Sequence, residues 1–319
     1  MVEEGELSLA HEYEWLKPRV EALVEIAKPL SIIHPDVFYE TGEWSIIKLL
    51  ALQRFVNIYT KIIKGPKQSK IFDNMYYIDL FAGSGLCKVG KAKDITAGSA
   101  VIAATQCYHP FDKYFLVEKN PESAYALNDR IKTLTSDYVL FNRDCNDCID
   151  EIIGELRTKD HYLAFVDCQG LDISWVTMKK LFSKNGDVLF NFQTQGVCRI
   201  PAKIRNRSQG WEACTEKMNW FFGDGRWRKC KEPDHLLLAY MNKIREESSR
   251  EIVLPLPVIG PRGYRYDVIL ATRRTRHGSP WIKPMEELKN KMGGYKPEIV
   301  KQTLDFLMKR QLTLNNVFG

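Results

Sequence analysis

The stretch Tyr76-Tyr-Ile-Asp-Leu-Phe-Ala-Gly-Ser-Gly85 decides the fold. Its first half is an apolar run typical of a buried strand, and its second half is a glycine-rich turn that follows an acidic residue, Asp79. Glycine at positions 83 and 85 permits a tight turn and lets the backbone approach a ligand, while Asp79 could accept a hydrogen bond from the ammonium group of an amino-acid moiety. A dinucleotide fingerprint would need a third glycine where the chain has Lys88, so the pattern argues against a nicotinamide dinucleotide.

Strand-like and helix-like segments alternate along the chain from this stretch onward. Apolar runs predict strands at 75–80, 114–118, 138–141, 162–167 and 187–192, and the segments between them predict helices at 97–106, 122–134, 146–156 and 174–183. Nearly continuous apolar strands separated by helices indicate a parallel sheet that is covered on both faces. Ligands of such sheets bind at the carboxyl ends of the strands, where this chain places Asp79, Glu118, Asp144 and Asp167.

The alternation ends after position 192. Two later strand-like runs, 252–259 and 264–272, have only four residues between them, which predicts a β-hairpin and not a crossover. A parallel five-strand sheet closed by a hairpin is the arrangement of class I methyltransferases, and it differs from the all-parallel sheet of dinucleotide dehydrogenases. The predicted fold class is therefore α/β: a Rossmann-like class I methyltransferase sheet closed by a β-hairpin, with N-terminal helices, an insertion after the fifth strand and a helical C-terminal tail.

The same pattern divides the chain into five predicted parts. Residues 1–70 form an N-terminal helical segment that lacks a cluster of catalytic residue types, and residues 71–195 form a Rossmann-like cofactor-binding core. Residues 196–250 form a basic and aromatic insertion, and residues 251–275 form the closing hairpin. Residues 276–319 form a helical tail, in which Gly293-Gly294 separates two amphipathic helices.

Composition bounds the class of protein. The 319 residues are 45% hydrophobic and 27% charged, as in ordinary globular proteins, and no apolar run approaches the roughly 18 residues that suggest a membrane span. The acidic N-terminus lacks the features of a secretory signal, so we expect a cytoplasmic protein without a membrane partner. Eight cysteines are too dilute for a disulfide scaffold. Cys145 and Cys148 form a CxxC pair, but no second pair completes a zinc site, so we expect buried free thiols and no metal.

Charge is distributed unevenly along the chain. The net charge is +6, yet residues 1–195 carry 22 Lys+Arg against 27 Asp+Glu, whereas residues 196–319 carry 24 against 13. The insertion mixes basic residues with aromatic ones, the combination that binds phosphates and stacks on bases. We therefore expect Arg226, Trp227 and Arg228 to bind a nucleic acid, RNA or DNA. The alternatives are a solvated basic face and tryptophans that pack in the core.

Two residues beyond the glycine-rich turn have the chemistry of adenosine recognition. Glu118 could accept hydrogen bonds from both ribose hydroxyls, although it could also be an exposed acid at a strand end. Asp144 could accept a hydrogen bond from the exocyclic amine of adenine, or Cys145 could line the base pocket. Asp144 is equally well placed to cap the helix that follows it.

These motifs carry a resemblance to a known family. The segment 79–85 resembles motif I of the class I methyltransferases, and the wider set resembles the three-Cys-motif partner protein family: a lysine-containing helix before motif I, Gly98-Ser99, Val117-Glu-Lys-Asn120, Phe165-Val-Asp-Cys-Gln-Gly-Leu171 and Asn191-Phe-Gln-Thr-Gln-Gly196. The resemblance implies S-adenosylmethionine as cofactor and an iron–sulfur protein with three cysteines as partner. The predicted cofactor contacts are Asp79, Phe81, Ala82, Gly83, Ser84, Gly85, Glu118, Lys119, Asp144, Cys145 and Asp167.

Asp167 is the candidate catalytic residue. It ends a central strand, and methyl transfer needs mainly an aligned nucleophile and a group that takes up one proton, which a carboxylate can do. The alternative is that Asp167 only caps the next helix. The family usually has proline after this aspartate, whereas the chain has Cys168, and this difference argues against methylation of an exocyclic amine. Cys168 as a covalent nucleophile would need an activating base, which the neighbouring sequence does not supply. Asn191, at the end of the fifth strand, is a candidate substrate contact.

Two functions of different classes remain open at this point. The first is an S-adenosylmethionine-dependent methyltransferase that acts on nucleic acid. The second is a partner subunit of an iron–sulfur protein that keeps the fold, with or without the cofactor, and transfers no methyl group. Cofactor turnover would discriminate between them.

Overall fold

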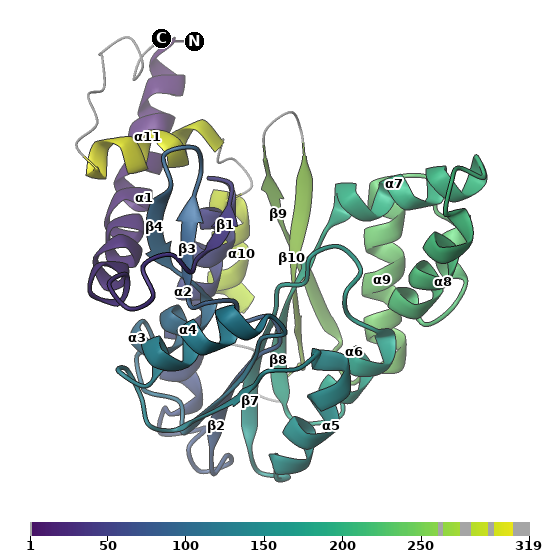
Figure 1. Cartoon of the computed structure of the whole chain (residues 1–319), viewed down its shortest axis with the longest axis horizontal. Coiled ribbons are helices and arrows are strands. Elements are labelled where there is room, and N and C mark those ends of the chain that lie inside the picture. The colour runs from purple at the N-terminus through teal and green to yellow at the C-terminus, as the bar shows by residue number, and fades with distance from the viewer. Residues whose placement is uncertain (1, 261–263, 275–281, 293–296, 309–319) are drawn as a thin grey trace.

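The computed structural model describes residues 2–260, 264–274, 282–292 and 297–308. A seven-stranded sheet runs through the centre of the molecule (Figure 1), in the order β6-β5-β2-β7-β8-β10-β9. The first five strands of this order are parallel, and β10 is antiparallel to both of its neighbours. The strands are β6 (Tyr138–Phe141), β5 (Lys113–Val117), β2 (Met75–Asp79), β7 (His161–Val166), β8 (Gly186–Phe192), β10 (Arg265–Thr272) and β9 (Ile252–Ile259). The predicted α/β fold, a Rossmann-like parallel sheet closed by a β-hairpin, is confirmed.

Helices cover both faces of this sheet (Figure 1). Alternate residues of each central strand enter different apolar clusters; on β7, Leu163 and Phe165 face one cluster, and Tyr162 and Ala164 face the other. The first cluster contains α1 (Val2–Leu30), α2 (Ser45–Ile63), α3 (Ser99–Thr105), α4 (Pro121–Ile131), α10 (Ile282–Met292) and α11 (Pro297–Leu307). The second contains α5 (Cys145–Glu155), α6 (Trp175–Leu181), α7 (Thr194–Arg205), α8 (Trp211–Phe222), the 3-10 helix η1 (Arg226–Lys229) and α9 (Pro233–Glu247).

Side-chain caps start the helices directly after the strands. Asn120 caps α4 by accepting a hydrogen bond from the Ser123 amide, and Asp144 caps α5 by accepting from the Asn146 amide. Ser174 caps α6 in the same way. These caps supply partners for amides that a helix leaves free at its first turn. The strand-to-helix loops are therefore fixed, and they gather the polar residues at one edge of the sheet.

A second, three-stranded sheet was not predicted. It pairs β1 (Tyr39–Thr41) in parallel with β3 (Leu86–Val89), which pairs in antiparallel with β4 (Asp94–Ala97). The turn between β3 and β4 places Gly90 and Lys93 in the left-handed region, with φ of 65° and 57°. Strands of three or four residues give too short an alternation to be detected in the sequence.

The remaining predictions about the fold have different outcomes. The N-terminal segment is not helical throughout, because β1 separates α1 from α2 and pairs with the core. The hairpin turn at 261–263 and Gly293-Gly294 lie outside the described residues. The five domain boundaries stay a prediction. Within the described residues, no helix is both long and apolar enough to span a membrane.

Candidate functional site

The glycine-rich turn after β2 has a backbone that only glycine adopts easily. Gly83 and Gly85 have φ of 61° and 81°, in the left-handed region. A Cβ at Gly85 would lie 3.1 Å from Leu127 Cδ1, so the turn also packs closely on α4. The Ala82 amide donates to the Val117 carbonyl at 2.9 Å, which ties the turn to the end of β5. The turn is thus held open toward the space above the sheet.

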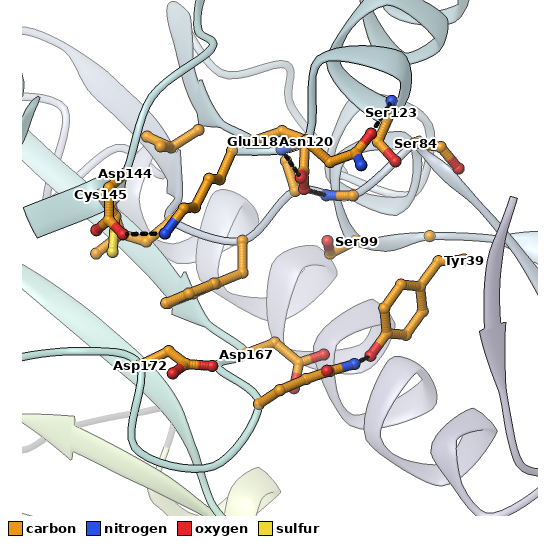
Figure 2. A pocket seen from close by; sticks show the side chains of 18 of the residues that line it. Tyr39, Ser84, Ser99, Glu118, Asn120, Ser123, Asp144, Cys145, Asp167 and Asp172 are labelled. Carbon is orange, nitrogen blue, oxygen red and sulfur yellow. Dashed lines mark hydrogen bonds and ion pairs between the residues drawn. The ribbon is translucent and has the colours of Figure 1, made fainter. Parts of the chain in front are cut away.

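Glu118 braces the turn from the neighbouring strand. One carboxylate oxygen accepts from the Gly83 amide at 2.8 Å, and the other accepts from the Asn120 amide at 2.7 Å (Figure 2). A carboxylate offers about four lone-pair positions, so each oxygen can accept one more hydrogen bond. Glu118 therefore fixes the loop and still presents acceptors to the cavity that it lines.

Asp79 lies beneath this turn and not beside a ligand. Its side chain is fully buried and is absent from the described residues that line the cavity. It accepts hydrogen bonds from the Tyr77 hydroxyl at 3.0 Å and from the Phe81 amide at 3.3 Å. Burial raises the pKa of the Asp79 carboxyl to about 7, although hydrogen bonds from Ser99, Phe81 and Tyr77 act in the opposite direction. The structure therefore corrects the predicted direct contact with an ammonium group: Asp79 supports the turn from below.

The turn and Glu118 open onto a cavity of about 950 Å³, here called the larger chamber. Ten of the predicted cofactor contacts line it: Phe81, Ala82, Gly83, Ser84, Gly85, Glu118, Lys119, Asp144, Cys145 and Asp167. The structure thus brings together residues from the ends of four successive parallel strands. Whether they contact a cofactor stays a prediction.

Asp144 caps the following helix and also lines the larger chamber, whereas its contact with adenine stays a prediction. One oxygen accepts from the Asn146 amide at 3.0 Å, and this is the cap of α5. The other lies 3.0 Å from Nζ of Lys119, which also lines the larger chamber. Burial acts to raise the pKa of Asp144, but the hydrogen bonds from Asn146 and Lys119 prevail and hold it below its ordinary value. Asp144 therefore lines the chamber as a carboxylate.

A second cavity of about 310 Å³, here called the smaller chamber, adjoins the first. Both chambers are lined by the same six residues, so they meet there: Tyr39, Thr41, Ser45, Lys48, Asp167 and Gln169. The remaining wall of the smaller chamber consists of Trp44, Cys168, Gly170, Asn191, Gln193, Tyr264 and Tyr266. The site is thus a large compartment connected to a small one, with Asp167 at the junction.

Asp167 is held by one group on each of its oxygens. One oxygen accepts from Asn191 Nδ2 at 2.6 Å, and the other lies 2.5 Å from Lys48 Nζ. Asp167 does not cap α6, because Ser174 has that position. Asn191 is buried, and its Oδ1 has no hydrogen-bond partner among the described residues.

Sequence reasoning missed the contribution of the N-terminal segment. Tyr39, Trp44 and Lys48 line the smaller chamber, although residues 1–70 were expected to lack a cluster of catalytic residue types. Burial raises the pKa of the Tyr39 phenol, and the nearby charge of Asp167 raises it further. The signal in the sequence was weak: Lys48 is a lysine within an otherwise apolar helix face.

Of the predicted substrate contacts in η1, the structure contradicts those of Trp227 and Arg226, whereas that of Arg228 stays a prediction. Trp227 is 3% exposed and donates its indole N–H to Asn219 at 3.0 Å, so it cannot stack on a base. Arg226 lies 3.0 Å from an oxygen of Asp224 and 2.9 Å from one of Glu246, which neutralise it. Arg228 is exposed and lies over the Trp227 ring. None of these three lines either chamber.

Two other residues of the insertion do reach the larger chamber. Lys217 and Trp220 of α8 line it, and Trp220 is 41% exposed. The predicted insertion therefore contributes to the site through α8 and not through η1.

The cysteines of the site pack as apolar side chains. Burial raises the pKa of the Cys168 thiol, which is 1% exposed, and no base activates it among the described residues. Burial likewise raises the pKa of Cys148 to about 11. No group of three potential metal ligands occurs in the part of the chain that the structure describes. The absence of a metal from the protein stays a prediction.

The chain has only distant similarity to known proteins. No family model and no curated protein matches the chain. A Legionella pneumophila protein is 13% identical, with a TM-score of 0.49, over 79% of this chain and 93% of its own. Trm1 from Pyrococcus horikoshii, solved with S-adenosyl-L-methionine, is 10% identical, with a TM-score of 0.39, over 70% of this chain and 55% of its own. An O-methyltransferase from Bacillus cereus, solved in complex with SAH, is 10% identical, with a TM-score of 0.37, over 80% of this chain and 100% of its own. These values assign neither a family nor a substrate.

Proposed function

We propose that this protein is an S-adenosylmethionine-dependent methyltransferase that acts on nucleic acid. The observation that carries the proposal is the pair of chambers that meet at Asp167. The larger is lined by the glycine-rich turn and Glu118, and the smaller is lined by aromatic and amide side chains. Such a pair provides one compartment for a donor and one for an acceptor, with a carboxylate between them.

The residues of the larger chamber fit the cofactor in their chemistry. The turn at Gly83 and Gly85 offers a cradle beside which a ligand can approach the backbone, and Glu118 offers acceptors for ribose hydroxyls. Asp144 and Cys145 would border the adenine. S-adenosylmethionine supplies a methyl group that is activated on a sulfonium centre.

The protein's own residues then position the acceptor and receive the proton that it loses. Asp167 lies where the chambers meet, so an acceptor atom in the smaller chamber can donate a hydrogen bond to it. Loss of that proton accompanies methylation of nitrogen or oxygen, and a positioned carboxylate can receive it. Alignment of the two reactants contributes the larger part of such a rate enhancement.

The nucleic-acid part of the proposal now depends on α7. Residues 188–211 contain four basic residues, Arg199, Lys203, Arg205 and Arg207, and no acidic residue. All four are exposed, and none forms an ion pair within the residues that the structure describes. The helix begins beside the smaller chamber, which Gln193 lines, and runs outward above α8 and α9 (Figure 1). A row of unpaired positive charge next to the acceptor compartment suits a polyanion.

Calorimetry tests the cofactor. We expect the wild type to bind S-adenosylmethionine and S-adenosylhomocysteine, and Glu118→Ala to weaken binding about tenfold to a hundredfold because it removes charge-assisted hydrogen bonds. Glu122→Ala is the matched control, because Glu122 is an exposed carboxylate on α4 that lines neither chamber. Equal affinity of Glu118→Ala and wild type would remove the ribose assignment.

Transfer is tested separately, with tritium-labelled donor and fractions of RNA, single-stranded DNA and protein. Label in a nucleic-acid fraction is the expected result. Label in protein alone would contradict the nucleic-acid proposal. Binding without transfer to any fraction would favour the alternative function, a cofactor-binding partner subunit of an iron–sulfur protein.

A further inference from the structure

Lys48 is a buried lysine at the junction of the two chambers. It is 8% exposed, it comes from α2, and its ammonium lies 2.5 Å from Asp167. An ammonium has three N–H donors, and among the described residues its only ion-pair partner is Asp167; the ring of Tyr266 lies 5.8 Å away. Because Lys48 lines both chambers, a ligand there that accepts from its ammonium would gain a charge-assisted hydrogen bond.

Asp167 lies beside Lys48 and presents hydrogen-bond acceptors. One carboxylate oxygen accepts a hydrogen bond from Asn191, the other forms the ion pair with Lys48, and each has a further lone pair. The two side chains together therefore form a donor next to an acceptor, with no net charge. A carboxylate or phosphate ligand would gain attraction from Lys48 but would be repelled by Asp167.

We propose that Lys48 and Asp167 jointly recognise the edge of a neutral planar heterocycle that carries a hydrogen-bond acceptor next to an N–H group. Such edges occur in amides and amidines, and adenine, cytosine, guanine and uracil each present one on the Watson–Crick side. Lys48 donates to the ring nitrogen or carbonyl, and Asp167 accepts from the N–H. The inference rests on the proposed function and narrows its acceptor to a single base in the smaller chamber.

The walls of the smaller chamber suit a flat ligand. Four aromatic side chains line it, namely Tyr39, Trp44, Tyr264 and Tyr266. Three hydrogen bonds hold the rings in place: Tyr264 donates to Gln193 Oε1 at 2.6 Å, Tyr266 donates to the Trp44 carbonyl at 3.0 Å, and Gln169 donates to Tyr39. A volume of about 310 Å³ lies at the lower end of the range for small-molecule sites, which leaves room for one ring system.

The experiment uses the whole protein with S-adenosylhomocysteine at saturation, so that the larger chamber is filled. Adenosine, cytidine, guanosine and uridine are titrated by ligand-observed NMR, each against its analogue methylated at the edge N–H groups. We expect at least one nucleoside to bind the wild type, and its methylated analogue and the Lys48→Met variant each to lower the affinity about tenfold, the effect of one hydrogen bond to a charged group. Lys48→Arg, which keeps the charge and the donors, should recover part of this affinity.

The matched control is Lys64→Met. Lys64 follows the other end of α2, lies 2.5 Å from Asp112 and lines neither chamber. It should leave nucleoside affinity unchanged. If Lys48→Met unfolds the chain, Lys48→Arg and the methylated analogues still test the proposal. Failure of all four nucleosides to bind, or equal binding by a nucleoside and its methylated analogue, overturns it. Failure of the wild type to bind S-adenosylhomocysteine refutes the proposed function instead, and the same titrations without that ligand then decide the recognition by Lys48 and Asp167.

Discussion

Residues 39–48 contain one basic residue, Lys48, and residues 226–247 contain six. Lys48 nevertheless lies where the two chambers meet, whereas Arg226 and Lys243 bind carboxylates of their own part of the chain. The two regions differ in where the carboxylate partners of their basic residues lie in the sequence. Acids that are near in the sequence neutralise Arg226 and Lys243, while the partner of Lys48 comes from the end of a distant strand and brings the lysine into the site.

The largest expected effect is a loss of stability, and it should differ between two tryptophans of the insertion. Trp227→Ala should destabilise the fold by about 3–5 kcal/mol, because it empties a buried site. Trp220→Ala should change stability by less than about 0.5 kcal/mol, because Trp220 is largely exposed at the larger chamber. Urea denaturation measures both. Equal stabilities of the two variants would show that Trp227 is not part of the core.

A substitution of Lys243 tests whether acids near in the sequence neutralise the basic residues of this region. Its side chain is 3% exposed and bridges Asp224, at 2.7 Å, and Glu247. Lys243→Met should cost about 3 kcal/mol, the lower end for a broken buried pair, because both carboxylates are partly exposed. Thermal or chemical unfolding gives the value, with the exposed Lys229→Met as control. A destabilisation below about 1 kcal/mol, the size expected of a surface ion pair, would contradict the structural assignment.

Asp79 is an acid that was predicted to contact the ligand but lies buried beneath the glycine-rich turn, and its pKa can be tested. Its pKa of about 7 exceeds the unfolded value, so the folded chain binds a proton that the unfolded chain releases. This contribution is complete at pH below about 4 and declines as the pH rises to about 7, by about 1.4 kcal/mol per pH unit. Asp79→Asn lacks that dependence. The difference in unfolding free energy between wild type and variant should therefore decline from pH 4 to 7 and level off above; a constant difference would contradict the raised pKa.

The smallest expected effect is a change in the salt dependence of RNA binding, which should distinguish the unpaired basic residues of α7 from the ion-paired Arg226 of η1. Arg199→Gln/Lys203→Gln should lower the salt dependence of single-stranded RNA binding by a log–log slope of about 1.4, or about 0.7 for each phosphate that a basic side chain no longer neutralises. Arg226→Gln should leave the slope unchanged, because η1 lines neither chamber and Asp224 and Glu246 neutralise Arg226. Fluorescence anisotropy against salt concentration checks both variants. An equal fall in slope per replaced basic residue in the two variants would argue against a special role for α7.

Local signals explain what could be predicted from the sequence. The apolar strands and the capping residues Asn120, Asp144 and Ser174 act over a few positions, so the alternation and the polar edge of the sheet follow from them. The turn at Gly83 and Gly85 is equally local. For this reason most predicted cofactor contacts do line one cavity.

Tertiary contacts explain what could not be predicted. Nothing near Lys48 in the sequence indicates that Asp167 lies 2.5 Å from it, and nothing near Trp227 indicates that α8 supplies the partner of its indole N–H. Composition alone gave the aromatic and basic residues of η1 a binding role, although aromatic rings in helices pack in cores just as readily. Burial decides between the two, and burial is a property of the whole fold.

The parallel pairing of β1 with β3 sets Tyr39 opposite Cys87 and Glu40 opposite Lys88. Successive side chains of a strand point to opposite faces, so a slip of one residue exchanges every neighbour. Deleting one residue in the connection that leads into β1 would turn Tyr39 outward and place Glu40 in the chamber beside Asp167. An acidic chamber would then repel electron-rich acceptors and attract cationic ones. Insertions or deletions in this connection would therefore change the junction of the two chambers, because Tyr39 and Thr41 of β1 line both of them.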